Sequence, residues 1–268
     1  MSRDHFRDGM RTVLVRACLG LCGALLLQIP VVDAAAQSQS KMMKIEERRL
    51  VRTVHFKFTI LQAGNPAGWE DVTRNDYSDN SVQFKSEVLL EFQQGAKTDI
   101  RTDLLLEEET FFPLKFEIDR NTKQGDVEFD IGSSIEWFSN VATVCKTSRG
   151  AKDTLNVVLP AGAAVVDMNV AHHLYVPLYW YDAASGGVQS FNVVDPISAK
   201  SFPATLRLQV SEKTSVNGEE IDTERYEFTR DKLTYKIYVD ADGRIVKVDQ
   251  GFLVYELSEW SENNAGGE

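Results

Sequence analysis

Cysteine is scarce in this 268-residue sequence, which has only three. Two of them, Cys18 and Cys22, lie in an apolar run near the N-terminus. If that run is removed during export, only Cys145 is left, and no intramolecular disulfide can form. The chain must then be stabilised by its hydrophobic core, for which a hydrophobic content of 43% is sufficient. We expect Cys145 to be a buried, small, apolar member of that core.

Basic residues are also in deficit, with 29 Lys and Arg against 40 Asp and Glu and a formal net charge of −11. A surface of this sign argues against binding nucleic acid, and against binding anionic lipid headgroups through charge. The acidic run Glu107–Glu109 lacks the Asp and Gly spacing of a calcium loop, so we interpret it as a solvated strand end.

Catalytic motifs are missing as well. The sequence has no serine elbow, no glycine-rich phosphate loop and no CxxC pair, and nothing places a histidine base beside Cys145. We therefore predict a protein that is not an enzyme and that holds no cofactor and no metal. A hydrolase that uses two carboxylates leaves no sequence motif, and this alternative stays open.

Histidine is rare too, but two of the four stand together as His172-His173. Adjacent residues on a helix point about 100° apart, whereas a zinc site built on a helix uses histidines at i and i+4 with a third ligand. We expect the pair to lie on a helix surface or at the rim of the core.

The N-terminus has the pattern of a secretory signal peptide. Arg11 and Arg16 precede an apolar run, and the small residues Ala34–Ala36 follow it. We predict a signal peptide over residues 1–36, a flexible lead-in over 37–44, and a periplasmic or secreted product. An uncleaved anchor is the alternative, although roughly 16 apolar residues are short for a bilayer. Met10 is an alternative start.

From residue 50 onward, apolar residues alternate with polar ones, which is typical of β-strands with one buried face. The inward positions of the first strands are predicted to be Val54, Phe56, Phe58 and Ile60; then Val82, Phe84, Val88, Leu90 and Phe92; then Ile100, Thr102, Leu104 and Leu106. Residues 63–80 are predicted to be a polar loop. Next, Leu114, Phe116 and Ile118 are expected to pair with Ile131, Phe129 and Val127, and two further strands to cover Ile135–Thr147 and Thr154–Leu159.

The pattern changes to helical spacing between Asp167 and Asp182. We predict a short apolar helix that begins at a cap provided by Asp167 or Asn169 and that Pro177 kinks or ends near Val176.

Strands return after this helix. A strand over residues 188–196 is followed by two hairpins. In the first, a three-residue loop over 216–218 would place Leu206 opposite Phe228 and Leu208 opposite Tyr226. In the second, Leu233–Leu257, a type I′ turn at Asp242-Gly243 would pair Val239 with Val246, Ile237 with Val248, Leu233 with Phe252, Lys236 with Asp249 and Tyr238 with Lys247. Residues 261–268 are expected to be a disordered tail.

Two segments resemble a known group of proteins. They are AHHLYVPLYWYDAASGGVQSFNVVDP (residues 171–196) and YEFTRDKLTYKIYVDADGRIVKVDQGFLVYEL (226–257). They are similar to uncharacterised periplasmic proteins related to the lipoprotein-carrier (LolA/LolB-like) half-barrels. The resemblance implies a curved antiparallel sheet whose apolar concave side can hold an acyl chain or a hydrophobic peptide segment.

The sequence thus predicts one mainly β domain over residues 45–260, an antiparallel half-barrel with one or two short helices on its concave face. We expect it to bind a hydrophobic, lipid-like ligand there without catalysis. The candidate ligand-binding residues lie on the predicted helix: Leu174, Tyr175, Leu178, Tyr179, Trp180 and Tyr181. Alternatively, this aromatic cluster only plugs the sheet, and the protein is a structural or assembly partner of another envelope protein. The oligomeric state stays open.

Overall fold

The computed structural model describes residues 48–264 except 93–94, 139–140, 149 and 161. Within these ranges the chain forms one sheet of 15 strands. The first eight strands are β1 (Leu50–Gln62), β2 (Asn65–Tyr77), β3 (Ser81–Glu91), β4 (Ala96–Glu107), β5 (Pro113–Gln124), β6 (Val127–Phe138), β7 (Val141–Ser148) and β8 (Ala151–Val158). The others are β9 (Ala164–Val165), β10 (Val188–Asp195), β11 (Lys200–Val216), β12 (Glu219–Arg230), β13 (Leu233–Val239), β14 (Ile245–Asp249) and β15 (Leu253–Asn264).

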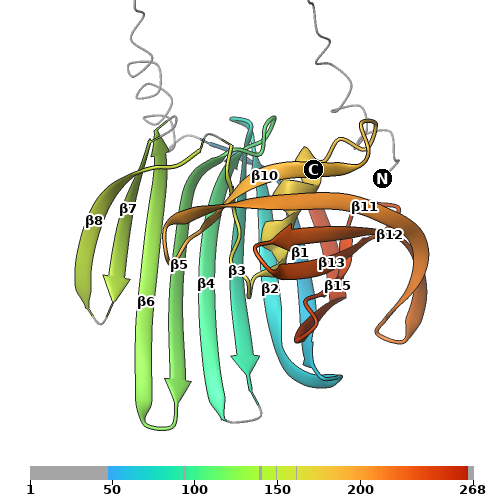
Figure 1. The fold of residues 1–268 in the computed structure, drawn as a ribbon, viewed down its shortest axis with the longest axis horizontal. Coiled ribbons are helices and arrows are strands. Elements are labelled where there is room, and N and C mark those ends of the chain that lie inside the picture. The colour runs from blue at the N-terminus through green and yellow to red at the C-terminus, as the bar shows by residue number, and fades with distance from the viewer. Residues whose placement is uncertain (1–47, 93–94, 139–140, 149, 161, 265–268) are drawn as a thin grey trace, which may run out of the picture.

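The strands follow one another in space almost as they do in sequence. The order runs from β8 back to β1, then from β15 back to β9, so the first and last strands meet in the middle of the sheet. All neighbours are antiparallel except the short pair β9 and β10. In Figure 1, β3 to β6 run vertically and β10 to β12 run across the view. The protein is therefore mainly β, with an open sheet, as predicted.

The core lies on the inner face of this sheet. Val54, Phe56, Phe58 and Ile60 are all buried on β1, which confirms the period-two pattern of that strand. The inward positions predicted for residues 82–90 and 100–106 are buried as well, and Phe92 packs against the core from a partly buried position.

One short helical segment packs against this inner face. A 3₁₀ turn, η2 (Ala171–Leu174), leads directly into the helix α3 (Tyr175–Trp180). No side chain caps either start, so the predicted caps were wrong. Pro177 lies in the first turn of α3, where a backbone N–H has no partner within the helix, and it is accommodated there without ending the helix.

The polar segment 63–80 is not a loop. Ala63 (φ 50°) and Gly64 (φ 80°) make a two-residue turn into β2, which pairs with both β1 and β3. Gly68 lies so close to β3 that a Cβ there would come within 1.8 Å of the carbonyl oxygen of Leu89. The prediction failed because the inner face of β2 carries polar residues, Glu70 among them, where apolar ones were sought.

The register predicted for the next hairpin was also wrong. β5 and β6 are joined at Gly125, so Phe116 pairs with Ile135 and not with Phe129. The longer strands carry Leu114, Val127 and Phe129 to exposed positions. The strand expected over Ile135–Thr147 is divided between β6 and β7, and Cys145 on β7 is only half-buried.

The hairpin of β11 and β12 has the predicted residue pairs, but its loop differs from the predicted one. Leu206 pairs with Phe228 and Leu208 with Tyr226, but the loop has only two residues, Asn217 and Gly218, both with positive φ. The register is shifted by one residue at Gln209, which forms a bulge inside β11. This bulge, rather than a longer loop, brings the apolar residues of the two strands opposite each other.

The last hairpin is confirmed over the pairs at Lys236, Ile237 and Tyr238. Its turn differs: only Gly243 has a positive φ (79°), and the Gly243 N–H donates to the carbonyl of Asp240. A three-residue loop then places Val239 opposite Ile245 and leaves Val246 as the extra residue.

The predicted pairing of Leu233 with Phe252 does not occur, and both side chains are exposed. A turn at residues 250–252 ends β14, and β15 then runs back to Asn264 beside β1, four residues into the segment expected to be a tail. The predicted signal peptide and lead-in lie outside the described residues. No helix in the described part has the length and apolar content that a membrane crossing requires.

Candidate ligand-binding site

A cavity of about 440 Å³ lies between α3 and the inner face of the sheet. Its walls come from segments far apart in sequence: β1, β2 and β3, the loop after β4, α3, β12, the turn between β13 and β14, and β15. It therefore exists only once β15 has paired with β1 and the helix has packed inside the sheet.

Aromatic rings form much of this lining. They come from the sheet, the loop after β4 and the helix: Phe56, Phe84, Phe111, Tyr175, Tyr179, Tyr226 and Trp260. The Phe111 and Tyr179 rings stack with their centroids 4.0 Å apart, and the Phe56 and Trp260 rings stack at 5.2 Å. Such an aromatic lining with a few polar groups is the usual form of a small-molecule site.

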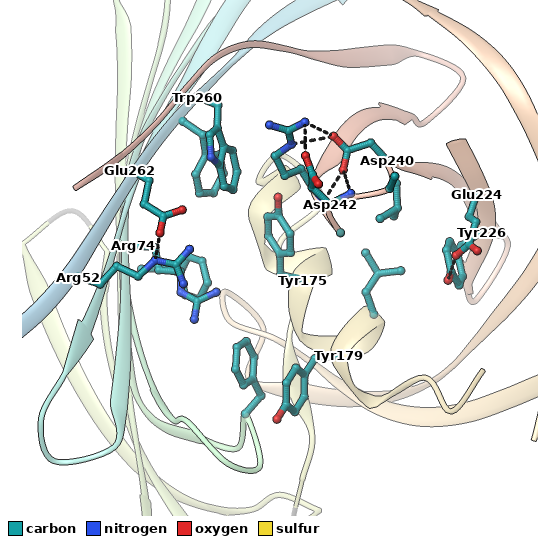
Figure 2. Close-up of a pocket in the computed structure, with 18 of the residues that line it drawn as sticks. Arg52, Arg74, Tyr175, Tyr179, Glu224, Tyr226, Asp240, Asp242, Trp260 and Glu262 are labelled. Atoms are coloured by element: carbon teal, nitrogen blue, oxygen red, sulfur yellow. Dashed lines mark hydrogen bonds and ion pairs between the residues drawn. The ribbon is translucent and has the colours of Figure 1, made fainter. Parts of the chain in front are cut away.

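The lining also carries three arginines, each held by a carboxylate. Arg52 Nε lies 2.8 Å from Glu262, and Arg74 Nε lies 2.7 Å from Asp76. Arg244 is paired with both carboxylates of the neighbouring turn, at 2.6 Å from Asp240 and 3.0 Å from Asp242. Figure 2 shows Arg52, Arg74 and Glu262 on one side of the cavity and Glu224 and Tyr226 on the opposite side.

Two further carboxylates, Glu108 and Glu224, line the cavity. In the described part of the chain, no basic side chain forms an ion pair with either. Desolvation, with a smaller contribution from the charge of Asp76, raises the pKa of Glu108 above its usual value. Glu224 accepts a hydrogen bond from the Tyr226 hydroxyl at 3.0 Å.

The structure brings three of the six predicted site residues to the cavity. Tyr175, Leu178 and Tyr179 line it. The Tyr175 hydroxyl accepts a hydrogen bond from the backbone N–H of Ile245 at 3.0 Å, and burial raises the pKa of Tyr175. The Tyr179 hydroxyl donates to the carbonyl of Glu109 at 3.1 Å.

The other three predicted residues lie elsewhere. Leu174 and Tyr181 are buried in the core. Trp180 packs against the ring of Phe112 and donates its indole N–H to the carbonyl of Thr110 at 2.6 Å, so it anchors the end of the helix outside the cavity lining.

The two histidines do not lie at a rim; both are fully buried. Glu70 of β2 reaches them from the sheet. Its carboxyl group accepts the backbone N–H groups of Ala171 (2.8 Å) and His172 (3.3 Å) and lies 2.7 Å from His172 Nδ1. Burial raises the pKa of Glu70 to about 8 and lowers that of His172 to about 3. Both shifts favour the uncharged forms, a protonated Glu70 carboxyl group beside a neutral His172 imidazole.

The segment before the helix is tied to both halves of the sheet. Asp167 pairs with Arg120 of β5 at 2.6 Å, and its backbone N–H donates to His173 Nδ1 at 3.1 Å. Arg230 of β12 donates to the carbonyl of Val166 and pairs with Asp195, both at 3.0 Å. These contacts fix α3, and therefore one wall of the cavity.

Sequence reasoning missed the charged side chains of this site. Glu70, Arg74 and Asp76 lie on one face of β2, but the residues between them on the other face are polar as well, so no alternation in the sequence marks them as inward-facing. Among the described residues, no three His, Cys, Asp or Glu side chains gather in a way that could hold a metal ion.

Comparison with protein families gives a match over residues 58–252 to the model of the Domain of unknown function (DUF6134). The chain belongs to this family. A DUF6134 domain thus includes α3 and most of the cavity wall, although four lining residues lie outside the matched range: Arg52, Phe56, Trp260 and Glu262.

Among solved structures, the DUF6134 chain is similar to the crystal structure of a beta-barrel-like protein of domain of unknown function DUF1849 from Brucella abortus. The two are 9% identical with a TM-score of 0.55, and the match covers 80% of this chain and 99% of that one. At this identity the similarity shows the fold alone. No curated protein matches the sequence.

Proposed function

We propose that this protein binds a small molecule with a large apolar part in the cavity between α3 and the sheet, without converting it chemically. The observation that carries the proposal is the cavity itself. Its volume of about 440 Å³ falls within the range of roughly 300–1,000 Å³ that is usual for small-molecule sites, and aromatic rings from six segments of the chain converge on it.

The charges of the site favour binding over catalysis. Each arginine of the lining is held by a carboxylate, so none is free to stabilise charge that develops in a reaction. A hydrolase with two carboxylates needs a pair whose environments drive their pKa values apart. Two carboxyl groups with a raised pKa lie near the helix, but they do not face each other across the cavity: Glu108 lines it, whereas Glu70 lies buried against the helix outside the lining.

The proposal places the protein in the periplasm, since the N-terminal sequence has the pattern of an export signal. We also propose that the protein is related to the lipoprotein-carrier half-barrels. The open, mostly antiparallel sheet and the helix inside it support this relation.

One observation favours a second function. β8 is an edge strand, and all but one of its eight residues are exposed. An extended segment of another envelope protein could add to this edge as a further strand. Replacing Leu155 by Pro should then abolish capture of that partner, and loss of capture without loss of folding is the outcome that supports this role.

The cavity is tested with N-phenyl-1-naphthylamine, an uncharged dye that fluoresces in apolar surroundings. We expect the protein to bind it and Ala241→Trp to weaken binding about tenfold or more, because Ala241 is an exposed turn residue whose enlarged side chain would enter the cavity. Ala151→Trp on β8, far from the cavity, is the matched control and should bind normally. Dye binding that is absent in the wild-type protein, or equal in both variants, would refute the proposal.

A further inference from the structure

We propose that the molecule bound in this cavity is a cation: an amine or quaternary ammonium group attached to an apolar body. This inference rests on the proposed function and adds the chemical class of the ligand.

The first argument is the balance of charge in the lining. Five carboxylates face the cavity (Glu108, Glu224, Asp240, Asp242 and Glu262) against three guanidinium groups. Asp76, just behind them, neutralises Arg74 as well. The walls are thus acidic even though they contain arginines, and an anionic headgroup such as a fatty-acid carboxylate would be repelled.

The second argument is the position of the acidic groups that have no basic partner. Glu108 lies near Arg74 and Arg52, whose positive charges partly offset the desolvation that raises its pKa. Glu224 lies across the cavity from these arginines (Figure 2), on β12 beside Val239. Because the arginines would repel a cation at their own side, Glu224 is the carboxylate that can best pair with the positive group of a ligand.

The third argument is that aromatic rings of the cavity make cation–π contacts with the protein's own arginines. The guanidinium carbon of Arg74 lies 5.7 Å from the ring centre of Phe84 and 5.9 Å from that of Phe111. That of Arg244 lies 5.7 Å from the ring centre of Trp260. Aromatic side chains combined with a carboxylate are the usual recognition elements for ammonium groups, and Tyr226 stands directly beside Glu224 in this way.

The test is a set of three amphiphiles with the same dodecyl chain: dodecyltrimethylammonium, dodecyl sulfate and uncharged dodecyl maltoside. Each is used below its micelle concentration to displace N-phenyl-1-naphthylamine from the protein. We expect the ammonium compound to displace the dye at a concentration at least tenfold lower than the sulfate, and the preference to shrink at high salt. Equal displacement by both, or stronger displacement by the sulfate, would overturn the inference.

The contact with Glu224 is tested by Glu224→Gln. The variant should bind the ammonium compound about tenfold more weakly while it binds the uncharged dye as the wild type does. Glu220→Gln is the matched control, since Glu220 lies exposed on the same strand. Glu108→Gln should show the same selective loss to a smaller extent. If no variant weakens ammonium binding, the inference is wrong.

The outcomes separate the two proposals. A wild-type protein that does not bind the dye refutes the proposed function, and this inference with it. A protein that binds the dye and dodecyl maltoside without preferring the ammonium compound keeps the proposed function and refutes only the cationic ligand.

Discussion

Two polar regions lie on the inner face of the same sheet, and they handle charge in opposite ways. Around Glu70, His172 and His173 the groups are fully buried, and the pKa shifts favour uncharged forms. In the cavity lining, three arginines form ion pairs with carboxylates, and the carboxyl groups of Glu108 and Glu224 border the cavity outside these pairs. The helical segment contributes to both regions: His172 of the 3₁₀ turn belongs to the buried region, and Tyr179 of α3 lines the cavity.

This contrast indicates a different role for each region. An isolated charge in a dry interior costs several kcal/mol. A buried carboxyl group that accepts hydrogen bonds from backbone N–H groups therefore has a structural role: it holds two segments together. Charges that border a cavity keep access to water and remain able to meet a ligand. The Glu70 cluster therefore holds the helix, and the cavity that the helix completes is the site.

The largest expected effect comes from breaking the buried region. Glu70→Ala leaves the N–H groups of Ala171 and His172, together with His172 Nδ1, without their partner in the core. We expect a loss of about 3–5 kcal/mol in the free energy of unfolding. Glu108→Ala, the matched change in the cavity, should cost less than about 1 kcal/mol. Denaturant unfolding measures both, and equal losses would mean that the two regions do not differ in kind.

The same contrast explains how far sequence reasoning reached. Strands whose inner face is apolar, such as β1 with Val54 and Phe58, were predicted correctly because alternation is visible in the sequence. β2 was missed because Glu70 stands where an apolar residue was sought. That position pairs with Phe58 and Val88, and only the assembled sheet shows that it is buried and that backbone donors 101 and 102 residues away satisfy it.

The site was half predictable for a related reason. The aromatic residues of the helix can be seen in the sequence, but helical spacing does not say which of them a curved sheet will cover. Tyr179 therefore lines the cavity, while its neighbour Trp180 donates a hydrogen bond to the carbonyl of Thr110. Arg52 and Glu262 come together only because β1 pairs with β15, a contact between opposite ends of the described chain.

The contrast between the core and the cavity also occurs within the helical segment. Leu174 is 2% exposed in the core, whereas Leu178, one turn later, borders the cavity. Leu174→Ala should lower the free energy of unfolding by about 2–5 kcal/mol, and Leu178→Ala by clearly less, since water or ligand already reaches that side chain. Leu178→Ala should instead weaken dye binding. If Leu178→Ala is as destabilising as Leu174→Ala, the cavity wall is simply part of the core.

The third prediction concerns the turn that carries Asp240, Asp242 and Arg244 into the cavity. Gly243 has a φ of 79°, which a β-branched residue resists. Gly243→Val should cost about 1–3 kcal/mol of stability, and Lys236→Ala on the adjacent strand well under about 1 kcal/mol, because its ion pair with Asp249 is exposed. Equal denaturant midpoints for the two variants would contradict the turn geometry.

The last and smallest effect is a change in how stability depends on pH. Glu70 keeps its proton in the folded protein up to a pKa of about 8, whereas the unfolded chain releases it near 4.5, so its contribution is lost as pH rises. The lowered pKa of His172 acts in the opposite direction, but only below pH 6.5, where the unfolded chain takes up a proton. Between pH 6.5 and 8 the Glu70 contribution therefore stands alone for this pair, and the free energy of unfolding should fall. Glu70→Gln should lack that part of the fall, while Glu87→Gln, an exposed change on β3, should keep it. Denaturant midpoints at the two pH values measure this difference, and identical slopes in the wild type and Glu70→Gln would show that Glu70 is ionised in the fold and that the buried region is charged like the cavity.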